Sequence, residues 1–392
     1  MKQPCAERLN KFETGIFASL NAERDRLTRE GKKLYNLFIG TPDFTPPAHV
    51  ISALTEAAAD PEAWKYSLAE SEELLDAVCD YYKDRFGVEI THDMIAAVNG
   101  SQEGMGHLGL ALLNKGDVVL LPDPGYPVFS AGAMLGEGKI EYYPLVKEYG
   151  FMPRLDLIDE DILKKTKYMV VSYPSNPVGA AADKSVYETL IEYSKRYDFI
   201  IINDNAYSDI IFDGRQGFSF LSIPSAAEVG AEFFSLSKSF NVTGARISFL
   251  IGRTDIINAL KKLRSQYDFG MFTPIQKAAV AALKGPRDEV LAQCREYQRR
   301  RDALCGTLRS FGWNIPDSDG TMFVWAPLPE GYSDSGEFCK LLVRETGVLA
   351  TPGVAFGPRG EGYIRFALVL PPEQLCEIGR IIGESSILKK EK

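Results

Sequence analysis

The chain has 392 residues, 45% hydrophobic and 25% charged, a balance typical of a folded globular protein of two or three domains. With 53 acidic against 44 basic residues its net charge is −9, so it lacks the positive charge of a general nucleic-acid-binding protein. No stretch approaches the ~18 apolar residues of a membrane span, and no apolar signal core follows the N-terminus. Six scattered cysteines favour free thiols. We therefore expect a cytoplasmic protein without nucleic-acid or membrane partners.

Helical and apolar segments alternate through most of the chain. A helical N-terminal arm is predicted at residues 12–30, ending at Gly31. Continuous apolar strands that alternate with helices indicate a parallel sheet covered on both faces, with the chemistry at the carboxyl ends of its strands. The predicted helices are 101–115 and 185–197, and the predicted strands are 118–121, 168–173, 199–203, 233–234 and 247–252.

The pattern changes after residue 276. A charged helix is predicted at 287–311, followed by short strands at 322–325 and 363–368. A helix followed by strands suggests a second, smaller α+β domain. The predicted division is an arm and part of the small domain at 1–45, a large domain at 46–285 and a small C-terminal domain at 286–392.

The three histidines, His49, His92 and His107, have no partner beside them in the sequence. We therefore expect neither histidine-based catalysis nor a bound metal.

The most informative segment is the run SLSKSFNVTGAR, which starts at Ser235. In it Lys238 follows an apolar strand, lies between Ser237 and Ser239, and precedes Arg246 by eight residues. A lysine in a partly desolvated pocket has a lowered pKa and can form a Schiff base, and hydroxyls with an arginine suit a phosphate. The alternative is a solvated loop lysine.

Four other loops carry candidate site residues, each with a structural alternative. Asp204 lies at the end of an apolar strand, where a buried carboxylate is costly unless it has a cationic partner; the alternative is that Asp204 caps the next turn. Asn176 lies in the turn SNPVG, and its amide can donate to a phenolate oxygen. Ser101 opens a helix, as an anion site or an ordinary N-cap. Tyr126 lies on a turn, where it either stacks on a flat ring or packs locally.

Because these five loops each offer one part of a single site, the chain resembles the class I/II pyridoxal-phosphate-dependent aminotransferases of fold type I. The resemblance extends from about residue 10 to 385. It implies an α/β fold with a large domain, whose mostly parallel sheet lies between helices, and a smaller α+β domain. The motifs that carry it are SxSK with the later arginine, DxAY after a strand, SNPxG, GTPDF at 40–44 and YIRF at 363–366.

The resemblance also implies roles in catalysis. Lys238 would hold the cofactor pyridoxal 5′-phosphate covalently and transfer the substrate proton. Asp204 would keep the ring nitrogen protonated, while Tyr207 and Asn176 would bond the ring 3-oxygen. Tyr126 would stack on the ring.

Further roles concern the phosphate, the substrate and a second subunit. Arg365, with Gly40 and Asn176, would bind the substrate carboxylate. Tyr66 would reach the phosphate of a neighbouring subunit, which implies a homodimer with shared active sites. The phosphate itself would contact Ser101, Gln102, Ser235, Ser237 and Arg246.

Three positions depart from the family pattern. Ala245 replaces a frequent tryptophan, and Ser71 and Asp76 stand where a glycine and an arginine are usual. Four acidic residues lie between positions 70 and 76. If one of these carboxylates faces the pocket, it would repel the acidic side chain of a dicarboxylic substrate. Alternatively, the four residues form the solvent-exposed face of a helix.

Within the family the chain looks most like the LL-diaminopimelate and alanine aminotransferase branches. We therefore expect an enzyme that moves an amino group from an alanine-like or LL-diaminopimelate-like donor to a 2-oxoacid by a ping-pong mechanism.

Three other functions are weighed against it. A C–S β-lyase of the same fold typically shows Asp-Glu-Ile-His where this chain has Asp204 to Tyr207. A non-catalytic regulator needs an appended DNA-binding module, for which residues 1–40 are too short. A dinucleotide-dependent dehydrogenase needs GxGxxG after an early strand, and the sequence lacks it.

Overall fold

The computed structural model describes residues 5–12 and 15–388. The predicted N-terminal arm contains helix α1 (Gly15–Arg29), and residues 13–14 of that arm lie outside the described residues. Gly31 follows α1 with φ of 77°, a left-handed conformation that glycine adopts readily.

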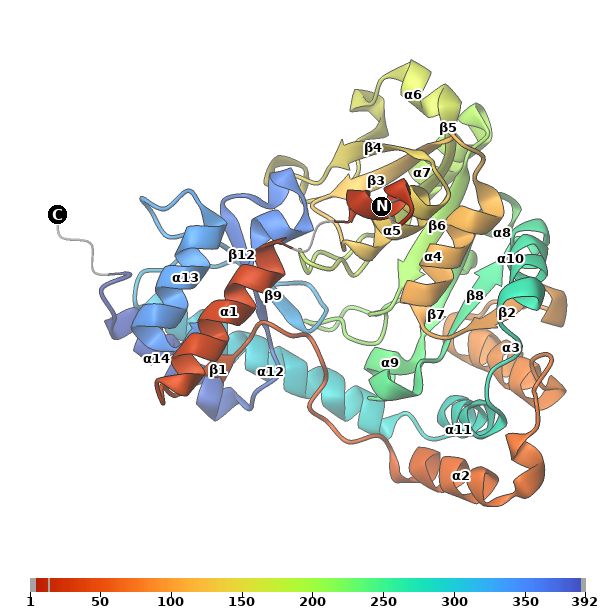
Figure 1. The fold of residues 1–392 in the computed structure, drawn as a ribbon, viewed down its shortest axis with the longest axis horizontal. Coiled ribbons are helices and arrows are strands. Elements are labelled where there is room, and N and C mark those ends of the chain that lie inside the picture. Colours follow the sequence, from red (N-terminus) through yellow and green to blue (C-terminus); the bar gives the residue numbers. More distant parts are fainter. Residues whose placement is uncertain (1–4, 13–14, 389–392) are drawn as a thin grey trace.

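A seven-stranded sheet forms the centre of the larger part of the molecule (Figure 1). All its strands run parallel except β8, which is antiparallel to both neighbours, so the α/β fold class with a mostly parallel sheet is confirmed. The connection from β7 to β8, residues 236–247, contains only the short helix α9 (Leu236–Ser239) and a 3₁₀ turn, and it returns the chain antiparallel to β7. In spatial order the strands are β2 (Ile95–Val98), β8 (Ser248–Gly252), β7 (Gly230–Ser235), β6 (Ile200–Asn205), β5 (Thr166–Val171), β3 (Val118–Asp123) and β4 (Lys139–Pro144).

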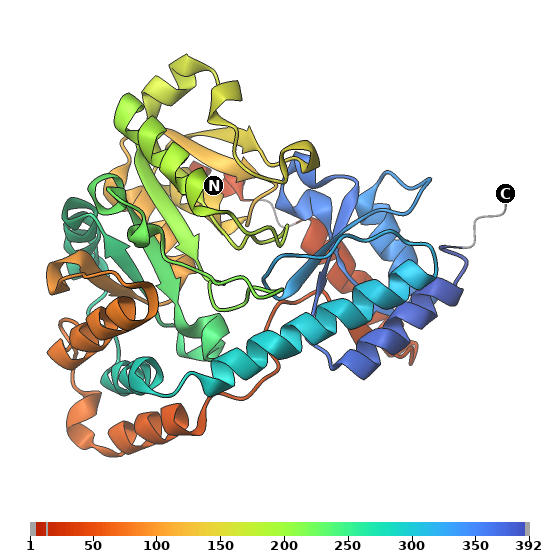
Figure 2. The same cartoon turned by 180° about the vertical axis from the view of Figure 1, so that it is seen from behind.

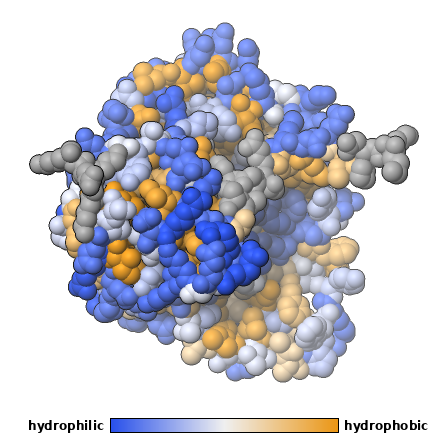
Figure 3. All heavy atoms as spheres, turned by 60° about the vertical axis from the view of Figure 1, so that its left-hand side comes forward, coloured by the Kyte–Doolittle hydropathy of each residue, from blue (hydrophilic) through white to orange (hydrophobic). Residues whose placement is uncertain are grey.

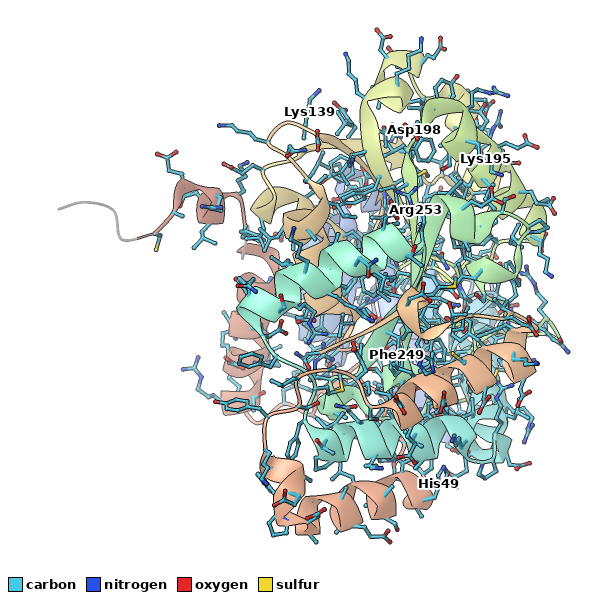
Figure 4. The ribbon with its side chains drawn as sticks, turned by 90° about the vertical axis from the view of Figure 1, so that its right-hand side faces the viewer. His49, Lys139, Lys195, Asp198, Phe249 and Arg253 are labelled. Atoms are coloured by element: carbon cyan, nitrogen blue, oxygen red, sulfur yellow. The ribbon has the colours of Figure 1, made fainter. Side chains whose placement is uncertain are left out.

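Helices cover both faces of this sheet, as the continuous apolar strands predict. One face packs on α4 (Ser101–Leu112), α5 (Val128–Leu135) and α10 (Thr254–Tyr267). In Figure 4, α10 lies in front of the sheet, and Phe249 of β8 lies in the interior. The opposite face packs on α3 (Glu72–Phe86), α7 (Lys184–Tyr197), α8 (Ala226–Val229) and α11 (Thr273–Lys284), and α2 (Ala48–Ala59) packs outside against α11 (Figure 1); the short α6 (Glu160–Lys165) precedes β5.

A second group of elements forms what we call the small unit. Its sheets are antiparallel β11–β12–β9 and parallel β1–β10, and the latter pairs the segment after α1 with the C-terminal part of the chain. α11 ends at Lys284 and α12 begins at Asp288, so the predicted boundary near 285 falls between them. The long helix α12 runs from the large sheet's side across the small unit (Figure 2). The elements are β1 (Tyr35–Asn36), β9 (Phe323–Pro327), β10 (Val348–Leu349), β11 (Thr351–Pro352), β12 (Tyr363–Ala367), α1, α12 (Asp288–Ser310), α13 (Ser335–Thr346) and α14 (Pro372–Glu384).

No helix within residues 5–12 and 15–388 combines the length and apolar character of a membrane span. The face shown in Figure 3 is mostly hydrophilic, with separate apolar areas on it.

Candidate active site

A cavity of about 360 Å³ lies at the carboxyl ends of the parallel strands, against the small unit. Every predicted site residue lines it except Tyr66. The chain thus brings together residues that lie far apart in the sequence, such as Gly40 and Arg365, which are 325 positions apart (365 − 40). Five further residues line it that the sequence analysis did not assign: Ile39, Thr41, Ala206, Thr243 and Phe323.

Lys238 lies on the short helix α9 (Leu236–Ser239), directly after β7. Its Nζ donates to the carbonyl of Gly40 at 3.0 Å, and its own carbonyl accepts from Gln293 of α12 at 2.8 Å. Burial, helped by the positive charges of Arg365 and Arg246, lowers the pKa of this amine to about 8. Near neutral pH a useful fraction of Lys238 is therefore uncharged and nucleophilic.

Asp204 lies near the end of β6, on the face opposite to that of its neighbours. Strand alternation turns Asn203 and Asn205 toward Glu232, to which both amides donate, at 3.2 and 3.3 Å. The Asp204 carboxyl has no such donor: its Oδ1 is buried without a hydrogen-bond partner among the described residues, and burial raises its pKa to about 7. A buried carboxyl of this kind fits a cationic ring nitrogen, which would return it to the ionised form.

The opposite end of the cavity fits a phosphate. Ser101 begins helix α4, whose N-terminal backbone amides and dipole favour an anion. Gly100 has a φ of 86° and leaves room for the guanidinium of Arg246. A Cβ atom at position 100 would lie only 2.2 Å from Nη2 of Arg246. The other predicted phosphate contacts, Gln102, Ser235 and Ser237, lie in the same cavity, as does Thr243.

Arg365 lies where a substrate carboxylate is expected. Its Nη1 donates to Asn176 Oδ1 at 2.7 Å, and its guanidinium lies over the ring of Phe323 at 4.0 Å. Its Nε is buried and has no partner among the described residues. Burial lowers the pKa of Arg365 to about 10, so the side chain stays charged at neutral pH and keeps donors for a carboxylate.

These features agree with a family comparison. The sequence profile of the family described as "Aminotransferase class I and II" matches residues 32–382, most of the chain. This chain belongs to the class I and II aminotransferases. The family depends on pyridoxal 5′-phosphate, so the protein is a pyridoxal-phosphate-dependent aminotransferase, and the main functional prediction is confirmed over the lyase alternative.

Curated relatives match this aminotransferase over nearly its whole length. It is 40% identical to the LL-diaminopimelate aminotransferase of Halothermothrix orenii, across 97% of this chain and 98% of the relative. The enzyme of the same name from Syntrophobacter fumaroxidans is also 40% identical, across 95% and 96%.

Solved structures show the same fold. Substrate-bound BacF from Bacillus subtilis has a TM-score of 0.93 at 32% identity, covering 97% of this aminotransferase and 98% of BacF. A variant of aspartate aminotransferase from Thermus thermophilus has a TM-score of 0.91 at 26% identity, covering 97% and 99%.

Tyr126 and Tyr207 of the aminotransferase flank the cavity. Burial raises the pKa of both phenols above the ordinary tyrosine value, so they remain protonated and can donate. Tyr207 packs edge-on to Phe323, with 6.0 Å between ring centroids, while Tyr126 comes from the turn after β3.

Tyr66 lies outside its own chain's cavity. The side chain is 84% exposed, and its ring contacts only Phe269 among the described aromatic residues, with centroids 5.5 Å apart. Its position therefore leaves it free to reach another subunit.

The hypothesis that an acidic residue between 70 and 76 faces the pocket is wrong for this chain's own cavity, which none of them lines. Glu70 accepts from the backbone of Ala97 at 2.8 Å, and Glu73 pairs with Lys277. The segment is the start of α3, where Ser71 is the N-cap and accepts from the backbone of Leu74.

Two of the three histidines lie beside carboxylates in the structure. His92 Nε2 lies 2.8 Å from Asp76 Oδ1, and His107 Nδ1 lies 3.1 Å from Glu103. His107, Glu103 and Asp268 place ligand-type atoms within 4.8 Å of one another, yet Asp268 is also bonded to Arg264 at 3.0 Å. The second of these pairs follows from helical spacing, because Glu103 and His107 are one turn apart on α4.

Proposed function

We propose that this aminotransferase uses LL-diaminopimelate as its amino donor and a 2-oxoacid as acceptor, in a ping-pong reaction. The observation that carries the proposal is its 36–40% identity, over almost the full length, to relatives named LL-diaminopimelate aminotransferase. Among the described residues that line the cavity, the arginines are Arg246 and Arg365. With Arg246 at the phosphate end, Arg365 is the guanidinium in this lining that remains for the α-carboxylate of the donor.

The proposed chemistry rests on a few side chains. When bound, the cofactor supplies an electron sink that lets a proton leave the substrate α-carbon. Lys238 Nζ would take this proton from the substrate α-carbon and deliver it to the C4′ carbon of the cofactor, for which a pKa of about 8 suits an acid and base near neutral pH. Asp204 keeps the ring nitrogen protonated. Arg365, held by Asn176, orients the donor by its carboxylate.

The remaining predicted roles belong to the same proposal. Tyr207 and Asn176 bond the ring 3-oxygen, Tyr126 stacks on the ring, and Gly40 contacts the substrate. The phosphate is bound by Ser101, Gln102, Ser235, Ser237 and Arg246.

We also propose a homodimer that shares its active sites. Exposed aromatic side chains gather on two adjoining segments: Trp64 pairs with Phe272 at 5.1 Å and Tyr66 with Phe269 at 5.5 Å, measured between ring centroids. A second copy would cover these rings and place its Tyr66 at the phosphate end of the cavity.

A cytoplasmic location completes the proposal. It is supported by the six cysteines, all of which are free thiols in the structure, as a reducing compartment requires.

A donor screen tests the substrate. The ratio kcat/KM is measured for LL-diaminopimelate, alanine, aspartate and glutamate with several 2-oxoacids. LL-diaminopimelate should be the best donor. Aspartate preferred by about tenfold or more, ~1.4 kcal/mol of transition-state stabilisation, would contradict the proposal.

A further inference from the structure

Lys238 lies on a helix that is too short to hold its position alone. Helix α9 has only 4 residues, and so short a helix is marginal without packing around it. Figures 1 and 2 both show α9 beside the first turns of α12, and Gln293 of α12 contacts it. The place of the Lys238 amine therefore depends on the residues that fasten α9 to the elements around it.

A buried carboxylate binds the end of α9. Asp209 lies in the loop after β6, and its side chain has no exposed surface. Its Oδ2 accepts a hydrogen bond at 2.8 Å from the hydroxyl of Ser239, which directly follows Lys238 and is itself buried. Asp209 therefore fixes the residue next to the reactive lysine.

Three side chains from other elements hold Asp209 in turn. Its Oδ1 lies 2.6 Å from Nη2 of Arg287, the N-cap residue of α12, and 3.4 Å from Nε of Arg85, in the last turn of α3. The hydroxyl of Tyr81, also on α3, donates to Oδ2 at 3.4 Å. A buried ion pair is costly to break, because removal of one partner leaves the other charge uncompensated. Asp209 thus joins α9 to α3 and to the start of the small unit.

A second link runs from α12 to the backbone of Lys238. Gln293 is 5% exposed, and its Nε2 donates to the carbonyl of Lys238 at 2.8 Å. Its Oε1 accepts at 2.8 Å from Asn241, which lies just beyond the end of α9. Neither Gln293 nor Asp209 lines the active-site cavity, so both contact α9 from outside it.

We propose that Asp209 and Gln293 are positioning residues for Lys238, which fix α9 against α3 and α12 so that the lysine amine lies within reach of the cofactor. They act through α9 and contact neither cofactor nor substrate. A displacement of about 1 Å at a reacting group can slow a reaction by ~10²-fold, so the link has a measurable effect. Their role rests on the proposed function, in which Lys238 holds the cofactor.

The test separates capture of the cofactor by Lys238 from binding of the cofactor's ring and phosphate. The protein without cofactor is mixed with pyridoxal 5′-phosphate. The Lys238 amine adds to the aldehyde carbon, one water molecule leaves, and the change in absorbance gives the rate of capture. Pyridoxamine 5′-phosphate has no aldehyde and cannot form this bond, so its Kd, measured by calorimetry, reports the rest of the cavity.

Asp209→Asn should slow capture by about tenfold or more, because an amide cannot keep the two ion pairs of Asp209. Ser239→Ala and Gln293→Met each remove one hydrogen bond to or from α9, and each should slow capture by about threefold or more. In all three variants the Kd of pyridoxamine 5′-phosphate should stay within about twofold of the wild-type value, because the groups that line the cavity are unchanged.

Asp213→Asn and Gln298→Met are the matched controls. Asp213 lies in the same loop as Asp209, and Gln298 lies on the same helix as Gln293. Gln298 Nε2 donates to Asp213 Oδ1 at 3.1 Å, and both residues lie outside the active-site cavity. These two variants should capture the cofactor at the wild-type rate.

Unchanged capture in Asp209→Asn would overturn the proposal. So would a loss of capture matched by an equal loss of affinity for pyridoxamine 5′-phosphate, since that is a general structural defect. Ser239→Ala, which removes a single hydroxyl, gives the same decision if Asp209→Asn does not fold. Lys238→Ala identifies a failure of the proposed function: capture that persists in this variant overturns the role of Lys238 and with it the positioning. Capture that is lost in Lys238→Ala but unchanged in the other variants overturns the positioning alone.

Discussion

Lys238 combines burial with two nearby guanidinium groups, and both lower its pKa. The protein without cofactor should therefore bind pyridoxal phosphate faster as pH rises through about 8, because only the neutral amine is nucleophilic. The rate is followed by the absorbance of the bound cofactor. Arg365→Met should move the midpoint to higher pH, since a positive charge is removed. A wild-type midpoint near the ordinary lysine value of 10.5 would contradict this account.

Asp204 has the one carboxyl in the described lining of the cavity. Asp204→Ala should fold and still bind the cofactor through the phosphate end, yet the donor half-reaction should slow by about 10³-fold, ~4 kcal/mol, because the ring nitrogen loses its partner. Asp204→Glu is the control that keeps the charge. Stopped-flow rates within a few-fold of the wild type in Asp204→Ala would refute this role.

At this scale the sequence predicts the site well where the chemistry is distinctive. Lys238, Asp204 and Asn176 follow apolar strands in motifs, and all three line the cavity. Phe323 was missed because an apolar residue on a predicted strand is indistinguishable from core. Thr41 lies in the GTPDF motif beside Gly40, which was assigned to the substrate, but the motif gave Thr41 itself no role.

At the scale of elements, α4 and α5 cross unusually closely. A Cβ at Gly109 would lie 1.8 Å from the carbonyl oxygen of Gly132, so neither helix admits a side chain there. This contact fixes α4, whose first residue, Ser101, lies in the active site.

The prediction compares two glycines of α4. Gly109→Ala should destabilise the protein by about 1–3 kcal/mol, because the methyl group overlaps backbone atoms. Gly106→Ala, where a Cβ meets nothing within 4 Å, should be neutral or stabilise it by up to about 1 kcal/mol through helix propensity. Urea unfolding followed by circular dichroism measures both. Equal effects of the two substitutions would show that close packing is not the cause.

Several strands were predictable because they are buried on both faces, although β2, which is also buried throughout, was not predicted. β3, β5 and β6 read as continuous apolar runs, whereas the edge strand β4 is partly exposed and carries Lys139 and Glu141, so it gave no such signal. The two-residue strands β1, β10 and β11 are too short to leave a pattern. The pairing of such short strands with distant segments depends on tertiary contacts, which a short stretch of sequence does not reveal.

At the scale of the whole molecule, the single chain leaves Tyr66 outside its own cavity. In a dimer with shared sites, Lys238→Ala and Tyr66→Ala subunits are each impaired alone, but a mixed dimer contains one site with wild-type Lys238 and wild-type Tyr66. Unfolding and refolding the two variants together should therefore restore activity that neither has alone. Mixtures no more active than the better parent would show that Tyr66 does not act across subunits.

The most direct test of the central claim is reductive trapping of the cofactor. The holoenzyme is treated with borohydride, digested, and its peptides are analysed by mass spectrometry. The account predicts one labelled peptide, carrying the reduced cofactor on Lys238, and loss of the label in Lys238→Ala. A label on any other lysine would contradict the assignment of the active site.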